Sequence, residues 1–495
     1  MRSDFRGQLQ VLKRDIGFEY VRFHGILADE LLVYNEQSDG SVYYNFNHID
    51  ALLDTLLAEG VRPFLELGFM PSQLASSAGE IFYWKANVTP PKDLVRWLDL
   101  IEAFVRHLLN RYGIAEVVSW YFEFWNEPDI EGVFWKGSRE QFFDFFRASC
   151  ERLKTIDARL KIGGFGNLGM VGDGDWLQDF ADYARKHDLQ LDFYSFHVYH
   201  LSDFEVASEQ AAVATELLAD ADYASDLHSE LLNQLTGIRL GDANTIQRAV
   251  EEEVARSGTL PMTTEERWIT EWNANTDCRD LVHDTCYMAA FIIRTALQIG
   301  PHVEGLGFWT ATDLHEEFRL PQPVFHGGFG LMTYNGIKKA GFHAFAFLAK
   351  LGDEILLQKE GIIVTRRGDD YQILLYHYCH YNDLYDRFDY SQLTSISRYG
   401  VFLNSELEEV KVRLHSLNGD FTIEEQWVNR KQGSSFDAWV EMGAPDILNG
   451  AGHNHLVRMA EPGYRTRMER AEGIMELKAV LEPHEIRLVT IKRRY

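Results

Sequence analysis

Two glutamates stand where short apolar strands are predicted to end. The aromatic segment 120–126 is followed by Glu127 and then by Pro128, which lacks the N–H that a strand ladder needs. The segment Arg267–Trp272 carries Glu271 near its own end. Hydrolysis of a glycosidic bond needs two carboxyl groups, one to protonate the leaving oxygen and one to attack the anomeric carbon. We therefore hypothesise that Glu127 and Glu271 form a catalytic pair.

The immediate surroundings of Glu127 support this interpretation. Asn126 precedes it and could hold a sugar hydroxyl. The alternative is that Glu127 caps the helix that follows, which we would prefer for an isolated glutamate. The sequence Asn-Glu-Pro at a strand end favours catalysis, because the active sites of barrel enzymes lie at the C-terminal ends of their strands.

Strand-like and helix-like segments alternate through the first 350 residues or so. Helical stripes are readable at 49–57, which ends before Gly60, and at 94–108, which ends before Gly113; Ser138 and Gln141 have the spacing of a capping box. This alternation predicts a parallel α/β fold, a (β/α)8 barrel that gathers the strand ends at one mouth. The segments that read as strands are Tyr20–Gly25, Pro63–Gly68, Trp120–Asn126, Leu160–Phe165, Leu191–Tyr199, Arg267–Trp272 and Gly305–Thr310.

The pattern changes near residue 350. Four β segments follow, separated by Gly, Asn, Asp and Pro, at Val364–Tyr378, Val401–His415, Phe421–Val428 and Met475–Ile491. They predict a C-terminal antiparallel β-sandwich. We expect a catalytic barrel over residues 1–345 and the sandwich over residues 346–495. The stretch Leu201–Gly258 is rich in Ala, Glu and Leu and reads as a helical insertion between two barrel strands.

Composition narrows the classes of partner. The formal net charge is −27, which disfavours nucleic acid and anionic membranes as partners. The four cysteines have no C-x-x-C spacing, and no apolar run reaches 18 residues. We expect a soluble cytoplasmic protein without a metal or another cofactor; a homo-oligomer is left open.

One glycine motif suggests a different chemistry. Residues 164–169 fit G-x-G-x-x-G after a strand, as in dinucleotide-binding proteins. That interpretation requires the glycines to open a helix directly, whereas the next helical pattern begins only near Asp175. We therefore do not expect a dinucleotide site.

The chain resembles the family 39 glycoside hydrolases, which include β-xylosidases and α-L-iduronidases. The resemblance covers most of the chain, and the stretches that carry it are 20–25, 124–128, 269–271 and 326–331. It implies that Glu127 is the acid/base and Glu271 the nucleophile of a retaining exo-glycosidase that acts on β-xylosides.

The resemblance also implies residues that bind the sugar. Glu316 and Glu317 look like the paired glutamates that bind sugar hydroxyls in the xylosidase branch. His24 and His197 lie at strand ends and could hold hydroxyls, although such histidines are often satisfied core groups. Trp309 is a candidate ring platform, and Trp84 and Trp125 are further ones.

Two expectations follow from comparison with this family. Its barrel carries the acid/base on the fourth strand, whereas the strand before Glu127 is the third that the sequence shows. We expect the first barrel strand to be absent, as a start codon placed too late would produce.

Similar barrels also resemble a part of AraC-type transcription regulators, so the alternative function is a sugar-sensing domain. A sensor does not need both carboxylates, and their presence favours the enzyme.

Overall fold

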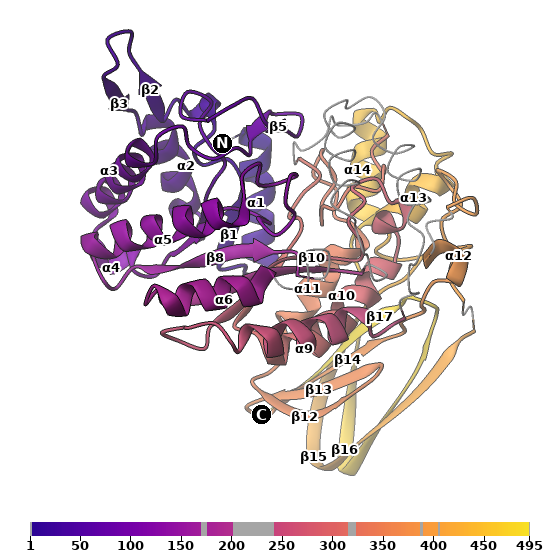
Figure 1. Ribbon diagram of the computed structural model, residues 1–495. Coiled ribbons are helices and arrows are strands. Elements are labelled where there is room, and N and C mark those ends of the chain that lie inside the picture. The colour runs from indigo at the N-terminus through magenta and orange to yellow at the C-terminus, as the bar shows by residue number, and fades with distance from the viewer. Residues whose placement is uncertain are drawn as a thin grey trace.

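The chain forms a parallel barrel sheet flanked by helices and, at the C-terminal end, an antiparallel sheet that extends from the bottom of the view (Figure 1). The computed structural model describes residues 2–169, 176–200, 242–314, 323–386, 390–403 and 406–494. Across these ranges, no helix combines the length and the apolar character that crossing a bilayer requires.

The barrel sheet has seven strands, and each overlaps one of the predicted segments. All neighbouring strands are parallel, and β1 and β11 stand at the two ends of the order. The described sheet therefore has one strand fewer than a (β/α)8 barrel, as the count of strand-like segments predicts. In their order the strands are β1 (Tyr20–Phe23), β4 (Arg62–Leu67), β7 (Tyr121–Phe124), β8 (Lys161–Asn167), β9 (Phe193–Tyr199), β10 (Arg267–Asn273) and β11 (Gly305–Phe308).

Three of the helices between these strands begin or end where the sequence predicts. Helix α2 (Asn47–Ala58) stops before Gly60, and α3 (Leu94–Tyr112) has Gly113 as its C-cap. The capping box of Ser138 and Gln141 begins α5 (Arg139–Ile156). The other long helices that flank the barrel are α1 (Ser3–Asp15), α6 (Trp176–Lys186), α9 (Thr245–Ser257), α10 (Tyr287–Ile299) and α11 (Ala340–Leu348). Helix α9 belongs to the predicted insertion, of which residues 201–241 lie outside the described residues.

The interior of the barrel is layered along the strands. An aromatic cluster closes its N-terminal end, formed by Tyr20, Phe64, Tyr121, Phe193 and Trp268. Because strand side chains alternate between the two faces, the residues two positions further along point inward again. These are polar: Arg22, Glu66, Glu123, Ser195 and Thr270. The aromatic layer thus supports a polar layer on which the C-terminal mouth of the barrel is built.

The C-terminal part is one six-stranded antiparallel sheet, so the predicted antiparallel β structure is confirmed. Apolar residues of β13 (Ile362–Arg367) and β14 (Asp370–Tyr376) pack in one core with those of the hairpin β15–β16 (Glu408–Val428 and Gly463–Leu481). The sheet thus folds over on itself, as the two layers of a sandwich do. The strand order is β12 (Glu354–Lys359), β13 (Ile362–Arg367), β14 (Asp370–Tyr376), β17 (Ile486–Arg493), β15 (Glu408–Val428) and β16 (Gly463–Leu481).

The strand bounds in this sheet differ from the predicted ones. The segment predicted as Val364–Tyr378 is a hairpin, because Gly368 adopts a left-handed turn conformation with φ of +62°. Conversely, β15 runs through Asn418-Gly419-Asp420, a sequence typical of turns, because its pairing with β16 continues along its length. The predicted boundary at residue 345 lies inside α11.

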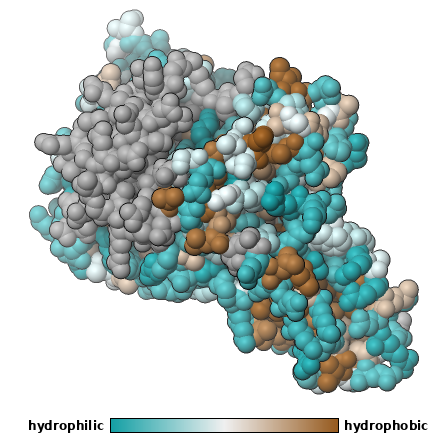
Figure 2. Space-filling model, turned by 90° about the vertical axis from the view of Figure 1, so that its right-hand side faces the viewer, coloured by the Kyte–Doolittle hydropathy of each residue, from teal (hydrophilic) through white to brown (hydrophobic). Residues whose placement is uncertain are grey.

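The surface of this sheet carries separate apolar side chains among polar ones. Ile355 on β12 and Met468 on β16 are 61% and 73% exposed. In Figure 2 the lower lobe shows brown patches interspersed with hydrophilic residues.

Candidate active site

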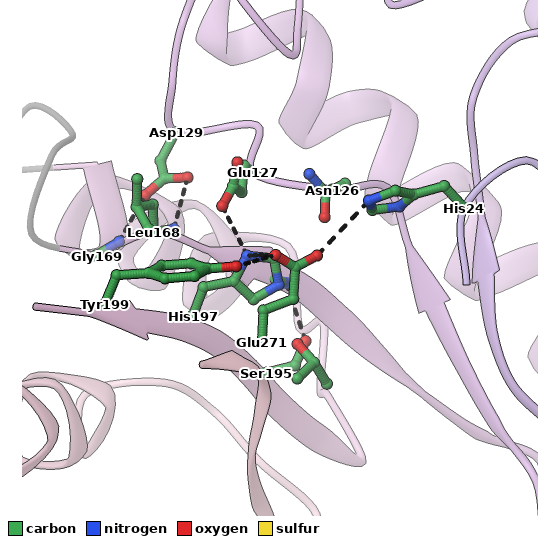
Figure 3. A network of polar contacts seen from close by, with 12 residues as sticks. His24, Asn126, Glu127, Asp129, Leu168, Gly169, Ser195, His197, Tyr199 and Glu271 are labelled. Carbon is green, nitrogen blue, oxygen red and sulfur yellow. Dashed lines mark hydrogen bonds and ion pairs between the residues drawn. The ribbon is translucent and has the colours of Figure 1, made fainter. Parts of the chain in front are cut away.

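Glu127 and Glu271 meet at the C-terminal mouth of the barrel (Figure 3). Glu127 follows β7 and Glu271 lies on β10, and the two residues are 7% and 5% exposed. One carboxylate oxygen of each lies within 4.8 Å of the other. The fold therefore brings together the two glutamates that the sequence singles out.

Glu127 occupies a strained turn. Its φ is +47°, and φ of Trp125 is +74°, both in a region that residues other than glycine rarely adopt. The Glu127 N–H donates to Gly166 O at 3.0 Å, and the Ile130 N–H closes the turn on Glu127 O at 3.1 Å. Strain of this kind persists where surrounding contacts hold it, and it is concentrated at functional sites.

Glu271 is directed inward by a bulge in β10. Ile269 pairs with Phe196 and Glu271 pairs with His197, so Thr270 is the extra residue on β10. A bulge changes the direction in which the next side chain points. Thr270 reaches Glu123 in the barrel interior, at 3.3 Å from Oε1, and Glu271 faces the same interior at the mouth. Two consecutive residues thus face inward.

Two donors hold the carboxylate of Glu271. Tyr199 Oη donates to Oε2 at 2.7 Å, and Arg22 Nη1 donates to Oε1 at 2.8 Å. His24 Nε2 lies 3.6 Å from the same Oε1. Donors and positive charges around a carboxylate favour its ionised form.

His197 lies between the two glutamates. Its Nδ1 is 2.7 Å from Glu127 Oε1 and 3.5 Å from Glu271 Oε2. Burial, with the nearby Arg22 and His24, holds the pKa of His197 well below its usual range, so the ring is neutral. A neutral imidazole carries one proton, and the two carboxylate oxygens assign it to Nδ1. His197 therefore donates to Glu127.

The polar layer beneath the mouth is linked through Arg22. Its guanidinium donates to Glu123 at 2.5 Å and to Asn126 Oδ1 at 2.9 Å, and it lies 3.1 Å from Glu66. Burial raises the pKa of Glu123, and the charge of Glu66 adds to this shift, although Arg22 opposes it. The buried guanidinium of Arg22 thus connects the polar layer to Glu271.

His24 is the second basic side chain in this arrangement. Its Nδ1 lies 2.5 Å from Glu66 Oε2. Burial lowers the pKa of His24. The negative charges of Glu66 and, to a lesser degree, Glu271 outweigh this effect and raise the pKa of His24 above its ordinary value.

The other predicted site residues fall into two groups. Asn126, His24 and His197 surround the glutamates, and the half-buried Trp309 has its ring centroid 5.0 Å from that of His24. Glu316 and Glu317 lie outside the described residues. Of the further ring candidates, Trp84 is half-buried, whereas Trp125 is wholly buried and is a core residue, which corrects that expectation.

Four residues of the site were not assigned to it from the sequence: Arg22, Glu66, Glu123 and Tyr199. Each lies two positions from another interior residue on its own strand. The available signal was a charged or hydroxyl side chain at an alternating position inside a strand predicted to be buried.

Carboxylate and imidazole side chains that lie this close together can also bind a metal ion. Among the described residues, Glu127, His197 and Glu271 form the one cluster whose atoms are close enough to share an ion. The Arg22 guanidinium already places a positive charge 2.8 Å from Glu271, which opposes a cation there.

Known proteins resemble the chain along almost its whole length. Residues 1–476 match the family described as Glycosyl hydrolases family 39. A Beta-xylosidase of Geobacillus stearothermophilus is 33% identical, over 100% of this chain and 90% of that protein. A second Beta-xylosidase, of Caldicellulosiruptor saccharolyticus, is 31% identical over 99% of this chain and 92% of that protein. The crystal structure of a monomeric beta-xylosidase from Caulobacter crescentus CB15 superposes with a TM-score of 0.84 at 28% identity, over 100% of this chain and 94% of that one.

These matches and the barrel define a glycoside hydrolase, a class of enzyme that acts on carbohydrate. More closely, the chain belongs to glycosyl hydrolase family 39.

Proposed function

We propose that the protein is a retaining exo-glycosidase acting on β-xylosides, with Glu271 as nucleophile and Glu127 as acid/base. The observation that carries the proposal is the approach of one oxygen of each carboxylate to within 4.8 Å. Retaining enzymes hold their two carboxyl groups about 5–5.5 Å apart, whereas inverting enzymes leave about 6.5–9.5 Å for a water molecule. An approach of single oxygen atoms to within 4.8 Å fits the closer pair of carboxyl groups, which supports direct attack by a carboxylate.

In the first step Glu271 attacks the anomeric carbon while Glu127 protonates the departing oxygen. Arg22 and Tyr199 favour the ionised form of Glu271 that attack requires. His197 donates to Glu127 Oε1 and so orients the carboxyl group that transfers the proton. The bond between the sugar and the leaving oxygen breaks, and a covalent bond between the sugar and Glu271 forms.

In the second step the sugar is released to water. Glu127, now ionised, takes a proton from a water molecule that attacks the anomeric carbon from the side the leaving group vacated. The bond to Glu271 breaks, and both carboxyl groups return to their starting states. Two inversions at the same carbon give net retention.

Recognition of the sugar is assigned to the polar groups at the mouth. Arg22 holds Asn126 Oδ1, so the amide N–H group of Asn126 is the donor for a hydroxyl. Trp309 is proposed as the ring platform, and Glu316 and Glu317 as hydroxyl acceptors. The choice of β-xylosides is supported by the two full-length relatives called Beta-xylosidase.

The test has two parts. A panel of nitrophenyl glycosides of xylose, arabinose, iduronate and glucose identifies the sugar, and we expect the highest kcat/KM for the β-xyloside. Proton NMR of the first product then follows its anomeric configuration before mutarotation. We expect β-xylose first; α-xylose as the first product would contradict a retaining mechanism.

A sugar-sensing domain of an AraC-type regulator is not favoured, since the full-length relatives are β-xylosidases. A cytoplasmic location, a homo-oligomer, the exclusion of nucleic acid and the domain division at residue 345 stay predictions.

A further inference from the structure

Asp129 lies two residues after Glu127 and is 5% exposed. Its two carboxylate oxygens accept different backbone N–H groups. Leu168 N–H donates to Oδ1 at 3.2 Å, and Gly169 N–H donates to Oδ2 at 3.0 Å (Figure 3). A buried carboxyl group that accepts two backbone N–H groups fixes two segments of the chain relative to each other. Here the segments are the turn of Glu127 and the residues that follow β8.

The same two segments are joined a second time. Glu127 N–H donates to Gly166 O, so the strained turn is connected to the end of β8 both at Glu127 and at Asp129. Gly166 has φ of +59°, and a Cβ there would lie 2.8 Å from His197 Nε2. The end of β8 therefore also packs against the ring that donates to Glu127.

Gly169 is held on its other side as well. Arg256 on α9 donates to Gly169 O at 3.1 Å, and the neighbouring Glu253 accepts from Tyr194 Oη at 2.5 Å. The segment to which Asp129 is bonded is thus anchored to β9 and α9. Asp129 can restrain the turn of Glu127 only if the segment to which it is bonded is itself held in place, because a mobile segment would move with the turn.

We propose that Asp129 is a positioning residue for Glu127: by tying the strained turn to the anchored end of β8, it keeps the carboxyl of Glu127 aimed at the leaving oxygen. The proposal rests on the proposed role of Glu127 as acid/base. It assigns Asp129 no contact with substrate. Its consequence is selective, because a misplaced acid harms the departure of poor leaving groups, whereas activated groups leave without a proton.

The test is Asp129→Asn, assayed on aryl β-xylosides from phenyl to 2,4-dinitrophenyl. An asparagine keeps one acceptor but directs an NH2 group toward the second N–H, so one of the two ties is lost. We expect kcat/KM for the phenyl glycoside to fall about 10- to 100-fold, and that for the dinitrophenyl glycoside less than about 3-fold. A uniform loss across the series, or no loss, would overturn the proposal.

The matched control is Asp93→Asn, which changes a carboxylate that accepts two backbone N–H groups at the start of α3. Its dependence on the leaving group should equal that of the wild type. If Asp129→Asn does not fold, Asp129→Glu keeps the carboxyl group but displaces it by one methylene, and it should show the same selective loss. A uniform loss in that variant would equally contradict the proposal.

Glu127→Ala separates this proposal from the one on which it rests. If Glu127→Ala shows a strong dependence on the leaving group and Asp129→Asn does not, only the role of Asp129 is wrong. If Glu127→Ala shows none, the assignment of Glu127 itself fails.

Discussion

Glu127 and Glu271, which are far apart in the sequence, each bring one carboxylate oxygen within 4.8 Å of the other at the mouth of the barrel. Their surroundings differ. Glu271 is bonded to Arg22 and Tyr199, whereas Glu127 accepts from the neutral His197. Two carboxyl groups in unlike environments divide the roles of nucleophile and acid between them.

Replacement of Glu271 removes the group that forms the intermediate. We expect Glu271→Ala to lower kcat by more than about 10⁴-fold on every substrate, activated or not. The measurement is steady-state turnover of phenyl and dinitrophenyl xylosides. Substantial residual activity on the dinitrophenyl glycoside alone would indicate that Glu271 is not the nucleophile.

Replacement of Glu127 acts on the leaving group. In Glu127→Ala we expect kcat/KM to fall about 10²- to 10⁴-fold for an unactivated glycoside and far less for the dinitrophenyl one. Comparing the slopes of rate against leaving-group acidity, in the variant and the wild type, measures this. Equal losses on both substrates would contradict the role of Glu127 as the acid.

The hydroxyl of Tyr199 stabilises the charge on Glu271. Tyr199→Phe removes one hydrogen bond to a carboxylate, a contribution of about 1.5–3 kcal/mol, so we expect kcat/KM to fall about 10- to 100-fold. Without this donor the carboxylate is protonated more easily, which shifts the acidic limb of the pH profile upward. The control is Tyr183→Phe, whose hydroxyl bonds to Asp144 away from the site. An acidic limb that does not move in Tyr199→Phe would speak against this role.

The pH dependence of stability reports on Asp129. Burial, together with Glu253, raises its pKa to about 7, although two backbone bonds oppose the shift. Between about pH 4 and 7 the unfolded chain is ionised at this position and the folded chain is protonated, so stability falls as the pH rises.

Asp129→Asn removes that proton linkage. Urea unfolding at pH 4.5 and 7 should show a smaller decrease in the free energy of unfolding than in the wild type, by at most about 3 kcal/mol. The same decrease in both proteins would mean that Asp129 is ionised throughout this range.

The strands and the residues at their ends could be predicted from the sequence, whereas the local backbone geometry of the site could not. The seven strand segments and the two glutamates were predictable, since apolar runs and an Asn-Glu-Pro ending are local features of the sequence. The bulge at Thr270 and the positive φ of Glu127 were not, because both depend on pairing with neighbouring strands.

The buried charges beneath the site were only partly predictable. Arg22, Glu66 and Glu123 occupy alternating positions of strands that the sequence predicts to be buried, but the side chains with which the barrel pairs them lie on other strands. Burial of a charge is tolerated only with such partners, and partners from separate strands are invisible in the sequence.

The most direct test of the account is to trap the covalent intermediate. A 2-deoxy-2-fluoro-β-xyloside with a dinitrophenyl leaving group forms the intermediate and releases it slowly, and peptide mass spectrometry then locates the sugar. The account predicts one added fluoroxylosyl group, on Glu271, and none in Glu271→Ala. Labelling of Glu127, or inactivation with the sugar on another residue, would contradict it.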